Sequence, residues 1–99
     1  MNIKIHSLRF DADSKLEEFI ETKVAKLNQY YEGIIGVEVT LKLDKAQNTE
    51  NKVTEIKLEI PGNDLFAKKQ SKSFEAATDT AVEALRRQLK KYKGKVRGE

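Results

Sequence analysis

The chain contains no cysteine, which excludes a disulfide-stapled scaffold, a thiolate metal site and a cysteine nucleophile. It contains one histidine, His6, in a segment with strand-like alternation, and a lone histidine of this kind is more often incidental than catalytic. Gly33, Gly36 and Gly62 do not form a phosphate-binding loop. These absences predict a protein that is not an enzyme and that has no cofactor, no metal site and no small-molecule substrate.

Long hydrophobic runs are also missing from the sequence. No apolar stretch approaches the roughly 20 residues that a membrane-spanning helix needs. The N-terminal sequence MNIKIHSLRF lacks the apolar segment and the cleavage site of a secretory signal. The 99 residues suit one compact domain. We therefore expect a single domain over residues 1–99, located in the cytoplasm and without membrane contact.

What the chain does have is positive charge concentrated at one end. Residues 85–98, LRRQLKKYKGKVRG, hold seven Lys or Arg residues and no Asp or Glu. Because the whole chain holds 19 basic and 16 acidic residues, residues 1–85 keep 12 basic and 15 acidic ones and a net charge of −3. A solvated helix end is the plain alternative, but one or two charges, each worth about 0.3–1 kcal/mol, are enough to offset a helix dipole. The excess favours a polyanionic partner.

Hydrophobic periodicity predicts four strands and two helices. Strands are expected at 2–10, 36–44, 53–60 and 65–70, and helices at 14–30 and from 74 to a frayed basic tail at 94–99. Ser14 followed by Glu17 resembles a capping box at the start of the first helix, and Ser73 is expected to cap the second. The sequence PGND at 61–64 predicts a turn.

The element order β-α-β-β-β-α predicts an α+β fold. We expect a two-layer sandwich in which a four-stranded mixed sheet carries both helices on one face. The first two strands should be parallel, through a right-handed crossover, and the next two should follow as an antiparallel meander. The other face of the sheet should be polar and should present Glu38, Thr40, Lys42, Thr54, Lys57 and Glu59.

Both helices are predicted to carry charge on their outer flanks, from a projection at about 100° per residue. On the second helix, the basic flanks consist of Arg86, Lys90 and Lys93 on one side and of Arg87 and Lys91 on the other. On the first helix, Lys15, Lys23 and Lys26 lie opposite Glu17, Glu18 and Glu21.

Two further groups on the helices are open to more than one interpretation. Asp79 and Glu83 lie one turn apart near Arg86 and Lys90, a spacing that favours intrahelical ion pairs over an acid–base couple. Tyr30 and Tyr31 are expected to close the core beneath the first helix, and stacking on a nucleic-acid base is the alternative.

The kind of nucleic acid follows from which side chains point outward. Gln88 lies near the apolar stripe of the second helix, and the outward residues are mostly Lys and Arg. This pattern favours recognition of backbone and shape over the reading of bases. The sheet lacks the paired aromatic residues of an RRM, and no GXXG loop indicates a KH domain. We therefore expect structured RNA that is held by its phosphates.

Residues 74–95, FEAATDTAVEALRRQLKKYKGK, resemble the C-terminal helix of the ribosome hibernation promoting factor family, also called ribosome-associated inhibitor or sigma-54 modulation proteins. The family pattern is Ala-Ala-x-Asp followed by Leu-x-x-Gln-Leu-x-Lys-x-Lys. It is matched here by Ala76, Ala77, Asp79, Leu85, Gln88, Leu89, Lys91 and Lys93. FIETKVAKLNQYY at 19–31 is similar to the family's first helix. The resemblance covers essentially the whole chain.

This resemblance implies that the chain binds the small ribosomal subunit in the channel for mRNA and the tRNA anticodon ends. It implies that binding blocks translation and holds ribosomes in a stored state in stationary phase or under stress. The basic helix faces would contact phosphates of the small-subunit (16S) rRNA. Carried over position by position, the rRNA contacts are Lys23, Lys26, Arg86, Arg87, Lys90, Lys91 and Lys93.

The resemblance leaves several points open. Long members add a C-terminal domain that pairs ribosomes, whereas this sequence ends at Glu99 and resembles the short type. It is open whether such a chain promotes ribosome dimers or locks single ribosomes. We expect a monomer away from the ribosome. Two alternative functions remain: a general binder of double-stranded or structured RNA, and a protein-interaction module that uses its basic tail.

Overall fold

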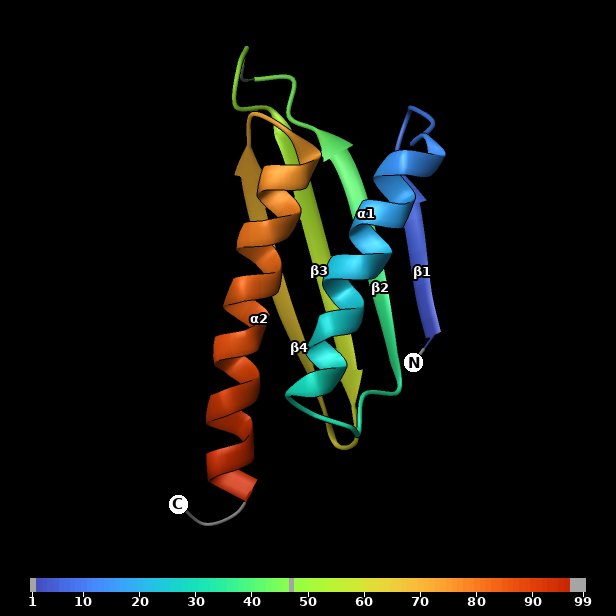
Figure 1. Cartoon of the computed structure of the whole chain (residues 1–99). Helices are drawn as coiled ribbons and strands as arrows, with labels where there is room; N and C mark the ends of the chain where they lie inside the picture. Colours follow the sequence, from blue (N-terminus) through green and yellow to red (C-terminus); the bar gives the residue numbers. More distant parts are fainter. Residues whose placement is uncertain (1, 47, 97–99) are drawn as a thin grey trace.

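The fold is a four-stranded mixed sheet with two long helices on one face, as expected from the sequence. The computed structural model describes residues 2–46 and 48–96, with side chains as far as Tyr92. The elements are β1 (Asn2–Ser7), α1 (Ser14–Ala25), the short 3₁₀ helix η1 (Lys26–Gln29), β2 (Gly36–Leu43), β3 (Lys52–Ile60), β4 (Asn63–Ser71) and α2 (Phe74–Val96). Figure 1 shows α1 and α2 side by side in front of the sheet.

The strand order is β1-β2-β3-β4. β1 pairs with β2 in parallel, and β2–β3 and β3–β4 pair in antiparallel fashion. The parallel pair follows from the crossover through α1, since the two strands that flank such a helix run in the same direction. This topology confirms the expected α+β two-layer sandwich.

The core lies between the helices and one face of the sheet. The alternation of β2 turns Val37, Val39 and Leu41 toward the helices, where they are fully or almost fully buried. Helix α1 contributes Ile20, Val24 and Leu27, and helix α2 contributes Phe74, Ala81, Leu85 and Leu89. Phe10, just before α1, stacks on Phe74 with 5.1 Å between ring centroids. This stack joins the N-terminal ends of the two helices.

One residue expected on the polar face of the sheet lies in the core instead. Thr54 pairs with Leu41 in the register, so it shares the helix-facing side with Ile56 and Leu58, and it is completely buried. Its hydroxyl lies 3.4 Å from the hydroxyl of Thr78 on α2, which is also buried. The expectation for Thr54 was wrong because strand alternation, rather than polarity, decides which way a side chain points.

The helix ends differ from the expectation in detail. Asp13, rather than Ser14, caps α1: its Oδ1 accepts a hydrogen bond from the Leu16 N–H at 2.8 Å. Ser73 caps α2 as expected, because its Oγ accepts a bond from the Ala76 N–H at 3.0 Å. The α-helical part of the first helix ends at Ala25, and η1 completes it with a bond from the Tyr30 N–H to the Leu27 carbonyl. Asn and Tyr favour the α-helix less than Leu or Lys, which fits this change of pitch.

The turn between β3 and β4 is tighter than expected. It uses Pro61 and Gly62 alone, with Gly62 at φ +78°, so Asn63 and Asp64 already pair with β3. β4 is correspondingly longer than the segment 65–70. At the other end of the chain, α2 continues through Gly94 to Val96, whereas fraying was expected from residue 94. The rest of the expected tail, residues 97–99, lies outside the described residues.

Candidate nucleic-acid interface

The candidate interface is the outer surface of the two helices. Among the predicted contacts, Lys23 and Lys26 come from α1 and η1, and Arg86, Arg87, Lys90 and Lys91 come from the last described turns of α2. Lys93 lies in α2, but its side chain is outside the described part of the chain. The helical repeat places Arg86 and Lys90 on the flank toward α1, and Arg87 and Lys91 on the flank toward β4.

Lys23 lies at the seam between the helices. Its Nζ is 3.2 Å from Asp79 Oδ1 on α2 and 5.5 Å from the centroid of the Phe19 ring. Asp79 was expected to pair within its own helix, and the structure corrects this: its recorded ion pair crosses to α1. The reason is the close packing of α1 against α2, which brings Lys23 within reach. Lys23 is thus held in place, with a third of its side chain exposed.

Among the predicted contacts whose side chains the structure describes, Arg86 is held most firmly. Its Nε donates to Glu83 Oε2 at 3.0 Å, and its Nη2 donates to the other oxygen of the same carboxylate. Its guanidinium carbon lies 5.8 Å from the centroid of the Tyr30 ring. The expected intrahelical pair of Glu83 is therefore confirmed. The carboxylate on one side and the aromatic ring on the other fix the guanidinium at the seam.

The remaining cations are more accessible. Arg87 is 70% exposed and touches Glu83 only distantly, at 3.8 Å. Lys26, Lys90 and Lys91 are exposed, and none of them forms an ion pair with another described residue. The three lysines can reach phosphates without giving up a described partner, and Arg87 gives up only its long contact with Glu83.

The electrostatics of this surface centre on Glu83. The hydrogen bond from Arg86 holds the pKa of the Glu83 carboxyl below its ordinary value, and the charges of Arg86, Arg87 and Lys90 act in the same direction, against a smaller opposing effect of burial. The same hydrogen bond raises the pKa of Arg86. Glu83 therefore stays ionised at neutral pH and organises the cations around it.

The two tyrosines at the end of η1 differ in role. Tyr31 packs edge-on against Tyr92 of α2, with ring centroids 5.6 Å apart, and closes the core as expected. Burial, together with the neighbouring Tyr92, raises the pKa of Tyr31. Tyr30 was also expected in the core, but it is 36% exposed and lies beneath Arg86. The sequence could not show this because the contact depends on how η1 meets α2.

Gln88 confirms one part of the sequence argument. Its Nε2 donates to the Phe66 carbonyl on β4 at 3.0 Å, so its amide is engaged within the protein. The outward side chains of the last turns are then lysines and arginines. Such a surface recognises phosphate geometry rather than base identity.

The opposite face of the sheet has a different charge pattern. Its charged members are Lys4, Lys42, Lys57 and Lys68, together with Glu38, Glu55, Glu59 and Asp64. The lysines and carboxylates are equal in number, and several are paired: Lys42 with Glu55 at 2.6 Å, Lys57 with Asp64 at 3.7 Å and Lys68 with Glu55 at 3.9 Å. This face is neutral overall, so the excess positive charge belongs to the helix layer.

Other kinds of site find little support in residues 2–46 and 48–96. Within these ranges, no group of three or more His, Asp or Glu side chains is placed to hold a metal ion. None of the described helices combines the length and the apolar character needed to cross a bilayer.

Comparisons with known proteins agree with the geometry. Residues 3–97 match the model of the family described as "Sigma 54 modulation protein / S30EA ribosomal protein". Proteins named ribosome hibernation promoting factor from Salmonella typhimurium and Escherichia coli are each 32% identical over 97 residues, which is 98% of both chains.

Solved structures show the same fold. A ribosomal subunit interface protein from Coxiella burnetii superimposes with a TM-score of 0.85 at 22% identity, over 95% of this chain and 99% of that one. The N-terminal domain of Thermus thermophilus Protein Y superimposes with a TM-score of 0.80 at 27% identity, over 93% and 99%. With the family model matching nearly its whole length, the chain belongs to the Sigma 54 modulation protein / S30EA ribosomal protein family, the family of ribosome hibernation factors.

Proposed function

We propose that this protein is a ribosome hibernation factor that binds the small ribosomal subunit in the mRNA and tRNA channel, through phosphates of the 16S rRNA. The observation that carries the proposal is the confinement of excess positive charge to the outer surface of the helices, while the opposite sheet face is neutral. The names of the relatives support the ribosome as the partner.

The proposed mechanism is competitive occupancy. The helices pack on a continuous core, so their cations move as one rigid body and can contact several phosphates at once. Each phosphate contact releases counterions, which favours binding at low salt. A folded domain in the channel then excludes mRNA and the anticodon ends of tRNA by its volume. The protein performs no chemistry in this scheme and acts in the cytoplasm, where ribosomes are stored in stationary phase or under stress.

The predicted contact residues differ in whether they must give up a carboxylate partner in order to bind a phosphate. Arg87, Lys90, Lys91 and Lys26 are exposed and can meet phosphates directly. Lys23 and Arg86 already have carboxylate partners, so a phosphate must share them or replace Asp79 and Glu83. We propose that the exposed group, joined by Lys93, supplies most of the affinity and that the held pair fixes the position of the protein on the RNA.

The test is a double charge reversal, Arg87→Glu with Lys91→Glu. Both side chains are exposed and outside the core, so the domain should fold while its ribosome affinity falls by at least tenfold. The matched control is Lys4→Glu with Lys72→Glu, which changes the charge equally at exposed positions outside the predicted contacts, on β1 and just before the N-cap of α2. Sucrose gradients with vacant ribosomes measure co-migration with the small subunit and with intact ribosomes.

The same gradients with added mRNA and initiator tRNA test the location. The proposal expects the protein to leave the ribosome when the channel is filled. Normal binding by the folded double variant, or binding that mRNA and tRNA do not affect, would contradict it. A protein that stays at the top of the gradient but binds naked duplex RNA would instead be a general RNA binder. A ribosome-dimer peak in the wild-type run would show whether the chain alone pairs ribosomes.

A further inference from the structure

A concave site lies at the end of the sheet where β1 and β2 finish, away from the C-terminal turns of α2 (Figure 1). It is a pocket of about 380 Å³ lined by Leu8, Arg9, Lys42, Leu43 and Lys45. Ligand pockets typically measure about 300–1,000 Å³, so this one suits a single small group rather than a helix or a strand. None of its residues belongs to the helix surface described above.

The pocket exists because β2 is longer than β1. The register ends with Ser7 opposite Leu41, and a last bond runs from the Leu8 N–H to the Leu41 carbonyl at 2.9 Å. Lys42 and Leu43 continue β2 beside β3 alone. Strand alternation points the backbone N–H and C=O of Leu43 to the side that β1 has left. The notch thus offers one donor and one acceptor at a strand edge.

Arg9 closes one side of the notch in an unusual backbone conformation. Its φ is +67°, the single positive value for a non-glycine residue in the described part of the chain. The neighbours on either side impose it: Leu8 is bonded to β2, while Phe10 is turned under the helices to stack on Phe74. A conformation of this kind is strained for a residue other than glycine and often marks a functional position. It directs the Arg9 side chain out of the core.

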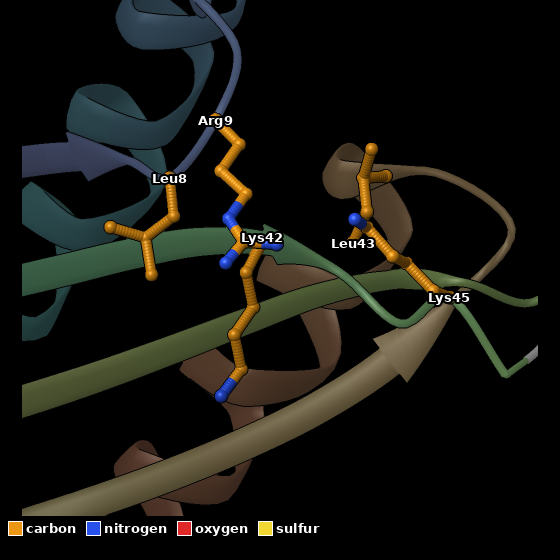
Figure 2. A pocket seen from close by; sticks show the side chains of 5 residues that line it. All are labelled: Leu8, Arg9, Lys42, Leu43 and Lys45. Atoms are coloured by element: carbon orange, nitrogen blue, oxygen red, sulfur yellow. The ribbon is translucent and has the colours of Figure 1, made fainter.

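The lining combines apolar surface with cations. Leu8 and Leu43 are 47% and 44% exposed, so two large apolar side chains at adjacent strand ends are open to a ligand. Figure 2 shows Arg9 and Lys45 extending toward β2 from opposite sides, whereas Lys42 runs away across the sheet. Neither Arg9 nor Lys45 forms an ion pair within the part of the chain that the structure describes, while Lys42 is paired with Glu55.

The nearby carboxylate of Asp44 is hydrogen-bonded to other residues than the cations of the notch. One of its oxygens accepts a bond from the Ala46 N–H, and the other accepts one from Gln70, each at 3.0 Å. The bond from Gln70 is also the main reason that the pKa of Asp44 is lowered. Both oxygens are hydrogen-bonded within the loop after β2 and to β4, and Asp44 forms no ion pair with Arg9 or Lys45 in the described part of the chain, so both cations can contact an anion.

We propose that this notch binds one unstacked nucleotide of the RNA on which the protein sits. The leucines would contact the faces of the base. The free backbone groups at the edge of β2 would form hydrogen bonds with the polar atoms of the base, and Arg9 and Lys45 would bind the flanking phosphates. Proteins hold single-stranded nucleotides with positive charge together with aromatic rings or guanidinium planes on which bases stack; in this notch Arg9 offers the guanidinium plane, and the leucines add apolar contact. The inference rests on the proposed ribosome binding and adds a contact at the far end of the molecule.

The first test removes the cations without disturbing the backbone. Arg9→Asn with Lys45→Gln keeps a residue that tolerates positive φ and takes away two charges. The expected result is an approximately tenfold or larger loss of ribosome affinity and a salt slope lower by about 1.4–1.8. Lys4→Gln with Lys72→Gln is the charge-matched control and should change neither. Equal effects in both double variants would overturn the proposal.

The second test identifies what occupies the notch. A diazirine analogue of leucine at position 8 is irradiated in the ribosome complex, and the adduct is digested with ribonuclease or protease. A crosslink to an unpaired rRNA nucleotide, lost in the Arg9→Asn, Lys45→Gln background, is expected. A crosslink to a ribosomal protein alone, or no crosslink from a bound protein, would overturn the proposal. The same analogue at Phe66, on the neutral sheet face, should give no rRNA adduct.

These outcomes separate the two proposals. If the notch variant binds normally while Arg87→Glu with Lys91→Glu abolishes binding, the notch proposal fails and the ribosome proposal stands. If the unmodified protein does not bind ribosomes at all, the failure lies in the proposed function.

Discussion

At the residue scale, the structure shows how carboxylates organise a surface whose excess charge is positive. Glu83 alone holds Arg86 through two hydrogen bonds and lies 3.8 Å from Arg87. Asp79 likewise holds Lys23 through an ion pair that crosses from α2 to α1. Arginine and lysine lose side-chain entropy when they are fixed, and these pairs fix two of them before RNA arrives. Preorganisation of this kind improves fit more than it adds to stability.

The titration of Glu83 is directly testable. The pKa of Glu83 in the folded protein lies below the ordinary 4.5. The ion pair with Arg86 therefore contributes its full share to the stability of the fold above pH 4.5, and this contribution is lost as the pH falls through the lowered pKa. Carbon-detected NMR should place the Glu83 midpoint below 4.5, and Arg86→Ala should return it toward that value. A midpoint that does not respond to Arg86→Ala would contradict the assigned cause.

The buried threonine pair gives a second residue-scale prediction. Thr78→Val removes the one recorded side-chain partner of the Thr54 hydroxyl inside the core. An unsatisfied buried hydroxyl costs about 1–3 kcal/mol, so chemical denaturation should show a loss of that size in the free energy of unfolding. Thr54→Val with Thr78→Val should recover part of it. A double variant that is less stable than Thr78→Val would show that the hydroxyls do not act as a pair.

At the element scale, function depends on the seam between α1 and α2. Asp79 and Glu83, the two carboxylates that pair with the basic residues, both lie on α2. Asp79 connects α2 to Lys23 of α1. Arg86, the partner of Glu83, connects α2 to the Tyr30 ring at the end of η1. The seam therefore sets the spacing of the cations, and it also limits which anions can bind, because RNA must compete with Asp79 and Glu83.

We expect Asp79→Asn with Glu83→Gln to relax this competition. Lys23, Arg86 and Arg87 would be freed, so the affinity for naked duplex RNA should rise by about three- to tenfold, and selectivity for ribosomes should fall. Fluorescence anisotropy with a labelled duplex measures the first effect, and competition by ribosomes measures the second. Stability should change by less than about 1 kcal/mol per pair, as is usual for exposed ion pairs. Unchanged duplex affinity would show that the carboxylates do not compete with RNA.

The elements were largely predictable from sequence, whereas their contacts were only partly so. Periodicity locates the strands and helices because burial on one face is a local property of the chain. The cap at Ser73 and the turn that contains Pro61 and Gly62 were also predicted correctly, because caps and turns depend on the chemistry of a few neighbouring residues. The partner of Asp79 and the place of Tyr30 depend on how two helices meet, which periodicity does not contain.

The notch illustrates a further limit of sequence-based prediction. The sequence around Arg9 does not indicate a positive φ. That conformation arises because Leu8, on one side, is hydrogen-bonded to β2 and Phe10, on the other side, is stacked on Phe74. Thr54 was misplaced although its parity with Ile56 was visible, because its polarity was given more weight than its position. Polar residues in strands follow the alternation of their neighbours.

At the scale of the whole molecule, shape and charge act together. The protein is elongated, about 45 × 24 × 18 Å, and α2 extends beyond the sheet at its C-terminal end (Figure 1). The basic turns of α2 are therefore presented at one end, and the notch lies at the other. Two separated contacts would fix the orientation of the body on an RNA surface better than one.

Salt dependence measures the sum of these contacts. If the six predicted contacts with described side chains (Lys23, Lys26, Arg86, Arg87, Lys90 and Lys91) each meet one phosphate, they alone should make the affinity for ribosomes fall with a slope of about 4–5 in log–log terms. Filter binding between low and physiological salt measures this slope. The Arg87→Glu, Lys91→Glu variant should lower it by about 1.4–1.8. A slope near 1 would mean that phosphate contacts are a minor part of binding.

The neutral sheet face has a consequence for what happens at high protein concentration. A polycation with charge all around bridges RNA molecules and precipitates them. Here the lysines and carboxylates of the outward face are equal in number, so a bound molecule turns a side without net charge to its surroundings. This face therefore does not attract a second RNA strand. Binding should therefore saturate at a fixed stoichiometry, and the protein could accumulate to ribosome-like abundance without turning RNA into condensates.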